Sequence, residues 1–372
     1  MGQFKQAGPL ISDNGVRAMG RTIRQRCPLI CGYYGEHNLG DDALLEVLLR
    51  NLPAGTEPVV TAHDQRWVRQ RFGVATCNRR SLWDVMGALR SCDSLLLGGG
   101  SLLQDATSFP SLLYYCLLML AARLQGKPVL LWGQGLGPLR RPISRALVRG
   151  ALPLASAISW RDAASFKLAE QLGCRKAAVG SDPVWAYPHR PWKGAKGPIV
   201  LCWRPLKALE PNGWRPYVDA LALLAERSER ELVWLPFHRR QDRGLLQQLQ
   251  QFTPLPRLLL ERSREVEVAD PAEAMTLFSE AGLVVAMRLH GLILAALAGS
   301  PVAALSYDPK VAAVARSLGC PLQDLEAPPH PKLAEEWLNQ LDQAPPAAPI
   351  QALRQQTAVH DLTLQRLRPG GE

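Results

Sequence analysis

Arg288 and His290 stand two positions apart, directly after the apolar run 283–286. Arginine binds anions and histidine exchanges protons near neutral pH, so this pair suits an anion site with an acid–base group beside it. A short apolar helix is expected over 292–298, and its N-terminus would add positive dipole close to both side chains. We predict a functional role for this pair rather than a structural histidine. Lys310 follows the next apolar run and is either a second cation for the same anion or a surface lysine.

Three glycine-rich segments follow predicted strands in the first half of the chain. They are CGYYGEHNLGDD at 31–42, LGGGSLLQD at 97–105 and WGQGLGP at 132–138. Glycine lets the backbone approach a ligand closely, and a helix N-terminus offers free N–H groups to an anion. Close packing of a helix on a sheet explains such glycines about as well. Because all three segments are predicted to be turns after strands of one domain, we expect them to line one rim.

The side chains within these segments are candidate substrate contacts. Asn38 either binds a substrate oxygen or stabilises its own turn. In the second segment Gly99 and Gly100 leave space beside the backbone, and Ser101 and Asp105 are predicted to bind substrate. The helix expected over 42–52 needs an N-cap, and either acid at 41–42 fits that position better than a catalytic one.

Arg161 lies in the segment SWRD, where a short strand ends and a helix begins. It either reaches into the crevice beyond the strands or forms an ion pair with Asp162 at the surface. Asp182, in the segment SDP, is most simply a residue that caps a turn.

Short runs rich in Val, Leu and Ile alternate with longer segments of helical period from residue 27 onward, which is typical of βαβ units. The alternation is interrupted by a turn-rich segment at 181–198 and then resumes. We therefore predict an α/β protein with two Rossmann-like parallel-sheet domains, whose ligands bind beyond the carboxyl ends of the strands. The predicted parts are a flexible basic tail at 1–26, an N-terminal domain at 27–190, a C-terminal domain at 191–330 and helices at 331–372 that brace both domains.

Composition limits the class of protein. The 372 residues are 47% hydrophobic and 20% charged, which suits a globular chain of two domains. The net charge of +10 forms no continuous stripe with aromatic side chains, so we expect no nucleic-acid partner. The tail lacks the apolar core of a secretory signal, and we expect a cytoplasmic protein; the tail is either solvated or attracted to an anionic membrane. The eight cysteines show no metal-binding spacing, and we expect neither a metal nor a cofactor.

Taken together, the motifs resemble the polysaccharide pyruvyl transferase family, in particular its bacterial cell-surface-anchoring (CsaB-like) branch. The matching segments are CGYYGEHNLGDDALL, LLLGGGSLLQDATSFPSLLYY, GKPVLLWGQGLGPL, SWRDAAS, GSDPVW and MRLHGLILAALAGSPVAALSYDPKV. The resemblance implies a glycosyltransferase-B-type fold with two Rossmann-like halves across a cleft. It also implies phosphoenolpyruvate as donor, and a pyruvate ketal on two hydroxyls of a sugar such as N-acetylmannosamine, in a cell-wall polysaccharide precursor, as product.

The resemblance also implies roles for single residues. It assigns catalysis to Arg288 and His290, and substrate binding to Asn38, Arg161 and Lys310. Phosphoenolpyruvate carries a carboxylate and a phosphate, so several fixed cations suit it. His290 would be the acid–base catalyst, Arg288 and Lys310 would hold the phosphate, and Arg161 would orient the donor across the cleft.

Two other functions stay open at this stage. A sugar-nucleotide glycosyltransferase or epimerase of the same fold is the close alternative, because a diphosphate would bind the same cations. A basic, non-enzymatic protein that binds anionic polymers or membranes is the third. The resemblance leaves open whether the acceptor sugar is lipid-linked, in which case the enzyme would contact the inner face of the cell membrane.

Overall fold

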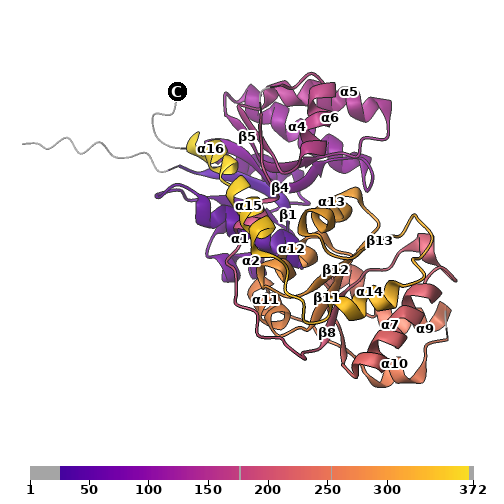
Figure 1. The fold of residues 1–372 in the computed structure, drawn as a ribbon. Coiled ribbons are helices and arrows are strands. Elements are labelled where there is room, and N and C mark those ends of the chain that lie inside the picture. The colour runs from indigo at the N-terminus through magenta and orange to yellow at the C-terminus, as the bar shows by residue number, and fades with distance from the viewer. Residues whose placement is uncertain (1–25, 176, 253, 368–372) are drawn as a thin grey trace, which may run out of the picture.

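The computed structural model describes residues 26–175, 177–252 and 254–367. The tail predicted at 1–26 therefore lies almost entirely outside the described residues. The described chain forms two parallel sheets in two layered α/β halves (Figure 1). This confirms the predicted fold class. The passage from the first sheet to the second runs through residues 180–198, which include the short 3-10 helix η2 (Pro183–Ala186).

The first sheet has seven strands in the order β3-β2-β1-β4-β5-β6-β7. This is the doubly wound order, in which right-handed crossovers place α1 and α2 on one face and α3 to α6 on the other. Its strands are β1 (Pro28–Tyr34), β2 (Val59–Ala62), β3 (Ala75–Asn78), β4 (Ser94–Leu103), β5 (Val129–Leu136), β6 (Ala157–Trp160) and β7 (Ala178–Val179). Its helices are α1 (Leu39–Asn51), α2 (Gln65–Phe72), α3 (Leu82–Ser91), α4 (Phe109–Leu124), α5 (Pro142–Ala151), the 3-10 helix η1 (Leu152–Leu154) and α6 (Ala163–Gln171).

The second sheet has six parallel strands in the order β10-β9-β8-β11-β12-β13. Its strands are β8 (Ile199–Cys202), β9 (Leu232–Trp234), β10 (Ser263–Glu265), β11 (Leu283–Ala286), β12 (Val302–Ser306) and β13 (Leu322–Asp324). The helices of this half are η3 (Lys207–Leu209), α7 (Arg215–Ser228), α8 (Arg239–Asp242), α9 (Leu245–Phe252), α10 (Arg257–Glu261), α11 (Pro271–Ser279), α12 (Leu289–Leu297) and α13 (Pro309–Leu318).

Two of the three glycine-rich segments are strands, which corrects the prediction that they are turns. β4 continues through Gly98, Gly99 and Gly100 to Leu103, and β5 continues through the third segment to Leu136. The two strands stay paired beyond the glycines, with a register shift between Gly100 and Leu103. Gly99 and Gly100 have φ values of +89° and +75°, a conformation that side chains with a Cβ rarely adopt. The glycines therefore allow an irregular strand rather than a reversal of the chain.

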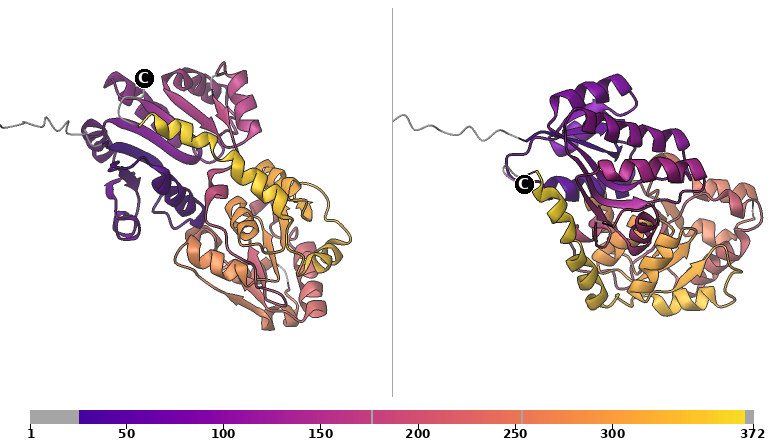
Figure 2. Two further views of the ribbon diagram at one scale, coloured as in Figure 1. Left: turned by 60° about the vertical axis from the view of Figure 1, so that its left-hand side comes forward. Right: turned by 90° about the horizontal axis from the view of Figure 1, so that it is seen from above.

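The helices at the C-terminus connect the two halves. α14 (Leu333–Gln340) packs on α7, α15 (Ala347–Gln356) contacts η2 and α13, and α16 (Val359–Gln365) lies against β5, β6 and β7 of the first sheet. Figure 2 shows these helices, in yellow, running from the second half of the molecule onto the first. His360 of α16 approaches the Ser181 carbonyl oxygen with its Nε2 at 2.8 Å. The last helix thus supports the segment between the two sheets.

The two halves also share a buried core and backbone contacts. One hydrophobic cluster contains side chains of α1, η2 and α12, so it extends across the boundary between the sheets. The Leu39 N–H donates to the Phe237 carbonyl at 3.1 Å, and the Arg239 N–H donates to the His37 carbonyl at 3.0 Å. These bonds join the first glycine-rich segment to the loop after β9, and they hold the carboxyl ends of the two sheets close together.

Candidate active site

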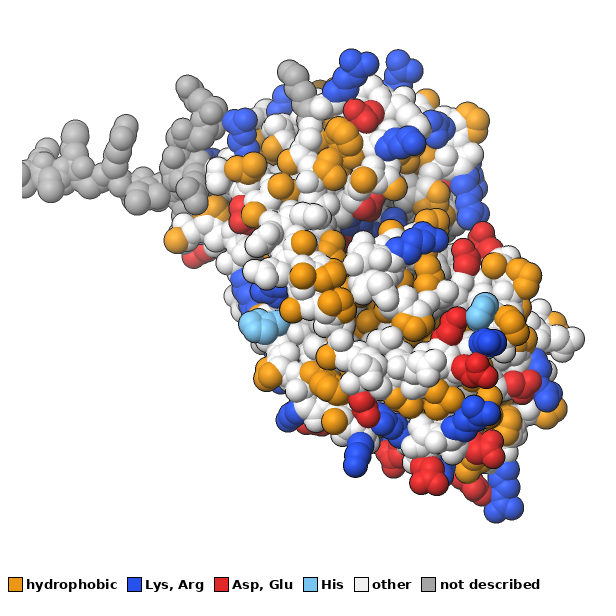
Figure 3. All heavy atoms as spheres, viewed as in Figure 1, with side chains coloured by type: hydrophobic (Ala, Val, Ile, Leu, Met, Phe, Trp, Pro, Cys, Tyr) orange, Lys and Arg blue, Asp and Glu red, His pale blue; other side chains and the backbone are white. Residues whose placement is uncertain are grey.

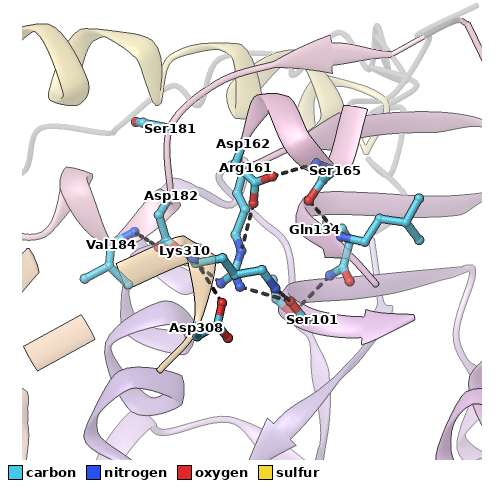
Figure 4. A network of polar contacts seen from close by, with 12 residues as sticks. Ser101, Gln134, Arg161, Asp162, Ser165, Ser181, Asp182, Val184, Asp308 and Lys310 are labelled. Carbon is cyan, nitrogen blue, oxygen red and sulfur yellow. Dashed lines mark hydrogen bonds and ion pairs between the residues drawn. The ribbon is translucent and has the colours of Figure 1, made fainter. Parts of the chain in front are cut away.

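The predicted site residues of both halves meet at the carboxyl ends of β4, β6, β11 and β12. The meeting point is Ser101, whose hydroxyl oxygen accepts hydrogen bonds from Arg161 Nη2 at 3.0 Å and Lys310 Nζ at 2.6 Å. Ser101 and Arg161 belong to the first half, and Lys310 lies in the first turn of α13 in the second (Figure 4). Two cations therefore converge on one neutral oxygen, which is an arrangement suited to an anion.

Lys310 is strongly affected by this position. Burial, with the nearby charge of Arg161, lowers the pKa of its ammonium to about 8. Its helix is capped by Asp308, whose carboxylate accepts a hydrogen bond from the Lys310 N–H at 3.0 Å. α13 begins one residue earlier, at Pro309, and the Lys310 side chain reaches Ser101 of the first half, so Lys310 is not a surface lysine.

Asp182 joins Arg161 to His290. Its Oδ2 accepts a hydrogen bond from Arg161 Nη1 at 2.9 Å and lies 3.4 Å from His290 Nε2, while its Oδ1 accepts from the Val184 N–H at 3.0 Å. Burial alone would raise the pKa of this carboxyl, but the charges of His290 and Arg161 outweigh burial and hold the pKa well below its usual range. The Val184 contact confirms the prediction that Asp182 caps a turn. The pairing of Asp182 with His290 was not predicted.

His290 lies in the first turn of α12 and packs against Gly40 of α1. A Cβ at residue 40 would overlap the Nδ1 atom of the imidazole. The glycine of the first motif is therefore required for close approach of a side chain from the other half. The imidazole thus contacts this glycine on one side and the Asp182 carboxylate through its Nε2.

Gly135 has a matching function in the third motif. A Cβ at this position would come within 2.7 Å of Arg161 Nε and would overlap the hydroxyl of Ser101. The second and third motifs thus both serve the contact between Ser101 and Arg161. The second and third motifs were predicted to line one rim. They lie side by side because they belong to the neighbouring strands β4 and β5.

Asn38 is the N-cap of α1. The sequence had predicted Asp41 or Asp42 for this position. Its Oδ1 accepts a hydrogen bond from the Gly40 N–H at 3.1 Å, and its Nδ2 donates to Asp41 Oδ2 at 2.5 Å. The helix begins at Leu39 rather than at residue 42 because the asparagine satisfies the first free N–H groups. The prediction that Asp41 or Asp42 caps α1 is therefore wrong.

Asp41 faces the site. Its Oδ1 lies 3.8 Å from the point that a Cβ of Gly100 would occupy. Burial raises the pKa of its carboxyl to about 6, and the charges of His290, Arg79 and Arg161 oppose that rise. A carboxyl that titrates near neutral pH beside His290 is able to give or accept a proton.

Arg288 hydrogen-bonds to two side chains of α8 in its own half. Its Nε donates to Asp242 Oδ2 at 3.0 Å, its Nη2 donates to Gln241 Oε1 at 3.1 Å, and it also binds Asp242 Oδ1. Asp242 is buried and accepts a further hydrogen bond from the His238 N–H at 2.8 Å. Arg288 and Lys310 hydrogen-bond to different side chains of the protein, Asp242 and Ser101, and their shared contact with a donor phosphate stays a prediction. Arg288 anchors the start of α12 to α8.

Asp105 has contacts typical of a structural residue. Its two oxygens accept hydrogen bonds from the Arg140 N–H at 2.7 Å and the Arg141 N–H at 2.9 Å. These bonds hold the segment that leads into α5 and lower the pKa of the carboxyl, against the effect of burial. The contacts do not place Asp105 with the substrate-binding candidates Gly99, Gly100 and Ser101.

No group of three or more His, Cys, Asp or Glu side chains that could hold a metal ion occurs in the described part of the chain. The same part contains no helix that is long and apolar enough to cross a membrane.

The two halves form a glycosyltransferase-B-like fold. Solved structures of this fold match most of the chain at low identity, which shows the fold alone. HepE of Anabaena, in complex with UDP and glucose, is 15% identical with a TM-score of 0.55, covering 92% of this chain and 97% of its own. The UDP-N-acetylglucosamine 2-epimerase of Rickettsia bellii is 8% identical with a TM-score of 0.57, covering 92% and 96%. That of Neisseria meningitidis, bound to UDP-GlcNAc, is 13% identical with a TM-score of 0.55, covering 91% and 100%.

The family is shown by the sequence itself. Residues 38–309 match the model of the polysaccharide pyruvyl transferase family, so the chain belongs to this family of enzymes. The matched range begins at the N-cap asparagine and contains Ser101, Arg161 and His290; it ends one residue before Lys310. The comparison with curated proteins finds no match.

Proposed function

We propose that this enzyme transfers the pyruvyl group of phosphoenolpyruvate to two hydroxyls of a sugar of the N-acetylmannosamine type. The product is a pyruvate ketal in a cell-wall polysaccharide precursor, and phosphate is released. We place the reaction in the cytoplasm, at the inner face of the cell membrane where the acceptor is lipid-linked. The observation that supports the donor most strongly is the convergence of Arg161 and Lys310 on Ser101 Oγ, at 3.0 and 2.6 Å.

The donor fits this point by charge. A carboxylate or phosphate oxygen that displaces the Ser101 hydroxyl would receive hydrogen bonds from both cations, each contributing about 1.5–3 kcal/mol. Gly100 on the same strand has no side chain, and the nearest atom to the place of a Cβ is Asp41 Oδ1 at 3.8 Å, so a three-carbon phosphorylated acid would approach the backbone beside that carboxyl. Arg288 acts here as a positioning residue, because its pairing with Asp242 orients the helix that carries His290.

The proton transfers balance if His290 and Asp41 each act once as acid and once as base. In the first step, one sugar oxygen bonds to C2 of the donor, His290 takes the proton of that hydroxyl, and Asp41 gives its proton to C3. In the second step, the bond from C2 to the phosphate oxygen breaks, and His290 returns its proton to the phosphate. The second hydroxyl then bonds to C2 and gives its proton to Asp41. Both groups are restored after one turnover.

The roles of the two groups follow from their surroundings. Asp182 accepts from His290 and keeps its ring in place, which suits a group that must carry a proton between two oxygens. Asp41 has a pKa near 6 because of burial, so a usable fraction holds the proton that C3 needs. A carboxyl at the ordinary pKa of about 3.9 would hold almost none at neutral pH.

The experiment is phosphate release from phosphoenolpyruvate on a panel of aryl-linked and lipid-linked amino sugars. We expect turnover with an N-acetylmannosamine-type acceptor, and loss of about 10²–10⁴ in rate in His290→Ala. Thermal unfolding is measured in parallel, because a ligand that binds only the folded chain raises its Tm. Stabilisation by UDP-sugars and none by phosphoenolpyruvate would instead support a sugar-nucleotide enzyme, and equal turnover in His290→Ala would remove the histidine from catalysis.

A further inference from the structure

We propose that the outer surface of α3, α4 and α5 docks on an anionic phospholipid membrane. The central element is α4, whose residues 109–122 contain no charged side chain. A helix that is apolar on all sides is normally buried, yet one side of α4 faces solvent. The exposed side carries four leucines spaced 4, 3 and 4 residues apart, namely Leu113, Leu117, Leu120 and Leu124. This spacing places them in one line along the helix.

The neighbouring helices extend this apolar line into a surface. Trp83 and Leu82 of α3 are exposed, the tryptophan to 84%, and Ile143 of α5 is exposed as well. α4 contacts α5, and Lys127 beyond the end of α4 donates a hydrogen bond to the Arg90 carbonyl at the end of α3. The three helices lie on the same face of the first sheet, since they pack around one core cluster. We call this surface the leucine face.

The leucine face is strongly basic. Six exposed arginines lie on or beside its helices: Arg90, Arg123, Arg140, Arg141, Arg145 and Arg149. Between residues 81 and 151, all of which are described, Asp84 is the one exposed acid. Figure 3 shows Lys and Arg side chains around the end of the molecule that carries α4 and α5, with hydrophobic side chains among them. Apolar and aromatic side chains flanked by arginine are the features that bind the boundary of an anionic bilayer.

The charge selects the membrane over a second copy of the chain. A symmetric dimer would bring the same six arginines of two copies together, with one acid on each side to oppose them. An anionic lipid surface attracts these arginines and accepts the leucines and Trp83 at the same time. Exposed tryptophan also suits the headgroup region, because its ring is apolar and its N–H is polar.

The location agrees with an enzyme that works on a membrane-bound substrate. β4 carries Ser101 of the active site, and the segment 104–108 leads directly from β4 into α4. The N-terminal end of α4 is therefore joined by a short segment to the strand that carries Ser101. The proposal itself does not depend on the reaction, because lipid binding is measured without turnover.

The test is co-sedimentation of the full chain with two kinds of vesicle, phosphatidylcholine alone and phosphatidylcholine containing phosphatidylglycerol. We expect binding to the anionic vesicles about tenfold or more above the neutral ones, with a decrease at high salt. Leu124→Asp should reduce the partition coefficient several-fold, and Leu117→Asp combined with Leu124→Asp about tenfold or more, since each change places a charge on the apolar line. Leu362→Asp is the matched control, because this leucine is exposed on α16, on another side of the molecule.

Three results would overturn the proposal. The first is equal binding to neutral and anionic vesicles. The second is unchanged binding of the double variant, which would move lipid attraction to another part of the chain. The third is a dimer in sedimentation equilibrium that the double variant dissociates, which would make the leucine face an interface between copies. Far-ultraviolet circular dichroism and thermal unfolding confirm that each variant is folded.

Discussion

The two arginines of the site differ in what their hydrogen-bond partners contact in turn. Arg161 of the first half donates to Ser101 and Asp182, and through them it is linked to Lys310 and His290 of the second half. Arg288 of the second half donates to Asp242 and Gln241, both on α8 of its own half. The first arginine lies where the two halves meet, and the second fixes one helix within its half. An arginine at the end of a strand can thus bind a ligand or stabilise the fold. The contacts made by its carboxylate partner distinguish these two roles.

The largest expected effect concerns Asp41, which we propose as the proton donor to C3. Asp41→Asn should lower kcat by about 10²–10⁴, since the amide cannot give a proton to C3, while the Kd for phosphoenolpyruvate changes little. Asp42→Asn is the matched control, because it makes the same change at the neighbouring residue of α1, whose buried carboxyl has no role in the proposed reaction; burial raises the pKa of that carboxyl well above the usual value. The measurements are phosphate release and calorimetric titration with phosphoenolpyruvate.

Two outcomes have separate meanings for Asp41. If the wild-type chain neither binds nor consumes phosphoenolpyruvate, the proposed function fails and the role of Asp41 fails with it. If the wild-type chain is active and Asp41→Asn is equally active, only the role of Asp41 is contradicted.

Arg288→Gln tests whether Arg288 stabilises its own half of the molecule. It leaves the buried Asp242 without its cation, so we expect a loss of about 3–5 kcal/mol in the free energy of unfolding. Chemical denaturation measures this loss. Replacement of both partners, by Arg288→Met with Asp242→Leu, should recover part of the stability. A variant as stable as the wild-type chain that fails to bind phosphoenolpyruvate would return Arg288 to the donor site.

Arg161→Gln tests the ligand side. We expect the Kd for phosphoenolpyruvate to rise about 10–100-fold, equivalent to the loss of one charge-assisted hydrogen bond of about 1.5–3 kcal/mol. Asp105→Asn is the control, because its carboxylate holds only the loop before α5 and the donor affinity should stay the same. Equal weakening in both variants would contradict the distinction between them.

The smallest effect is a pH dependence of donor binding. The pKa of Lys310 is about 8, so its positive charge is present below that pH and is lost above it. The Kd for phosphoenolpyruvate should therefore rise by up to about tenfold per pH unit above pH 8, and be flat there in Lys310→Gln. Calorimetry across this pH range gives the profile, and a flat wild-type curve would show that Lys310 does not hold the donor.

Much of the architecture was predictable from local patterns. The apolar run 283–286 is β11, and the alternation from residue 27 onward forms parallel sheets, because short apolar runs between helical segments have few other solutions. The strands through Gly98 and Gly133 instead extend into segments that were predicted to be turns. Glycine usually marks a turn, but here pairing with the neighbouring strand continues and only the register shifts.

The sequence by itself determined the family, the two alternating halves and the candidate residues Arg161, His290 and Lys310, because motif residues and strand ends are local properties of the chain. Only the tertiary structure decided the partners. Asp182 and His290 are 108 positions apart, and Arg288 and Asp242 are 46 apart, so no spacing rule connects them. The N-cap of α1 was also decided by the tertiary structure, since Asn38 and both following acids are chemically able to accept the same N–H groups. Hydrogen bonds depend on distance and direction in space, and packing of the two sheets sets both.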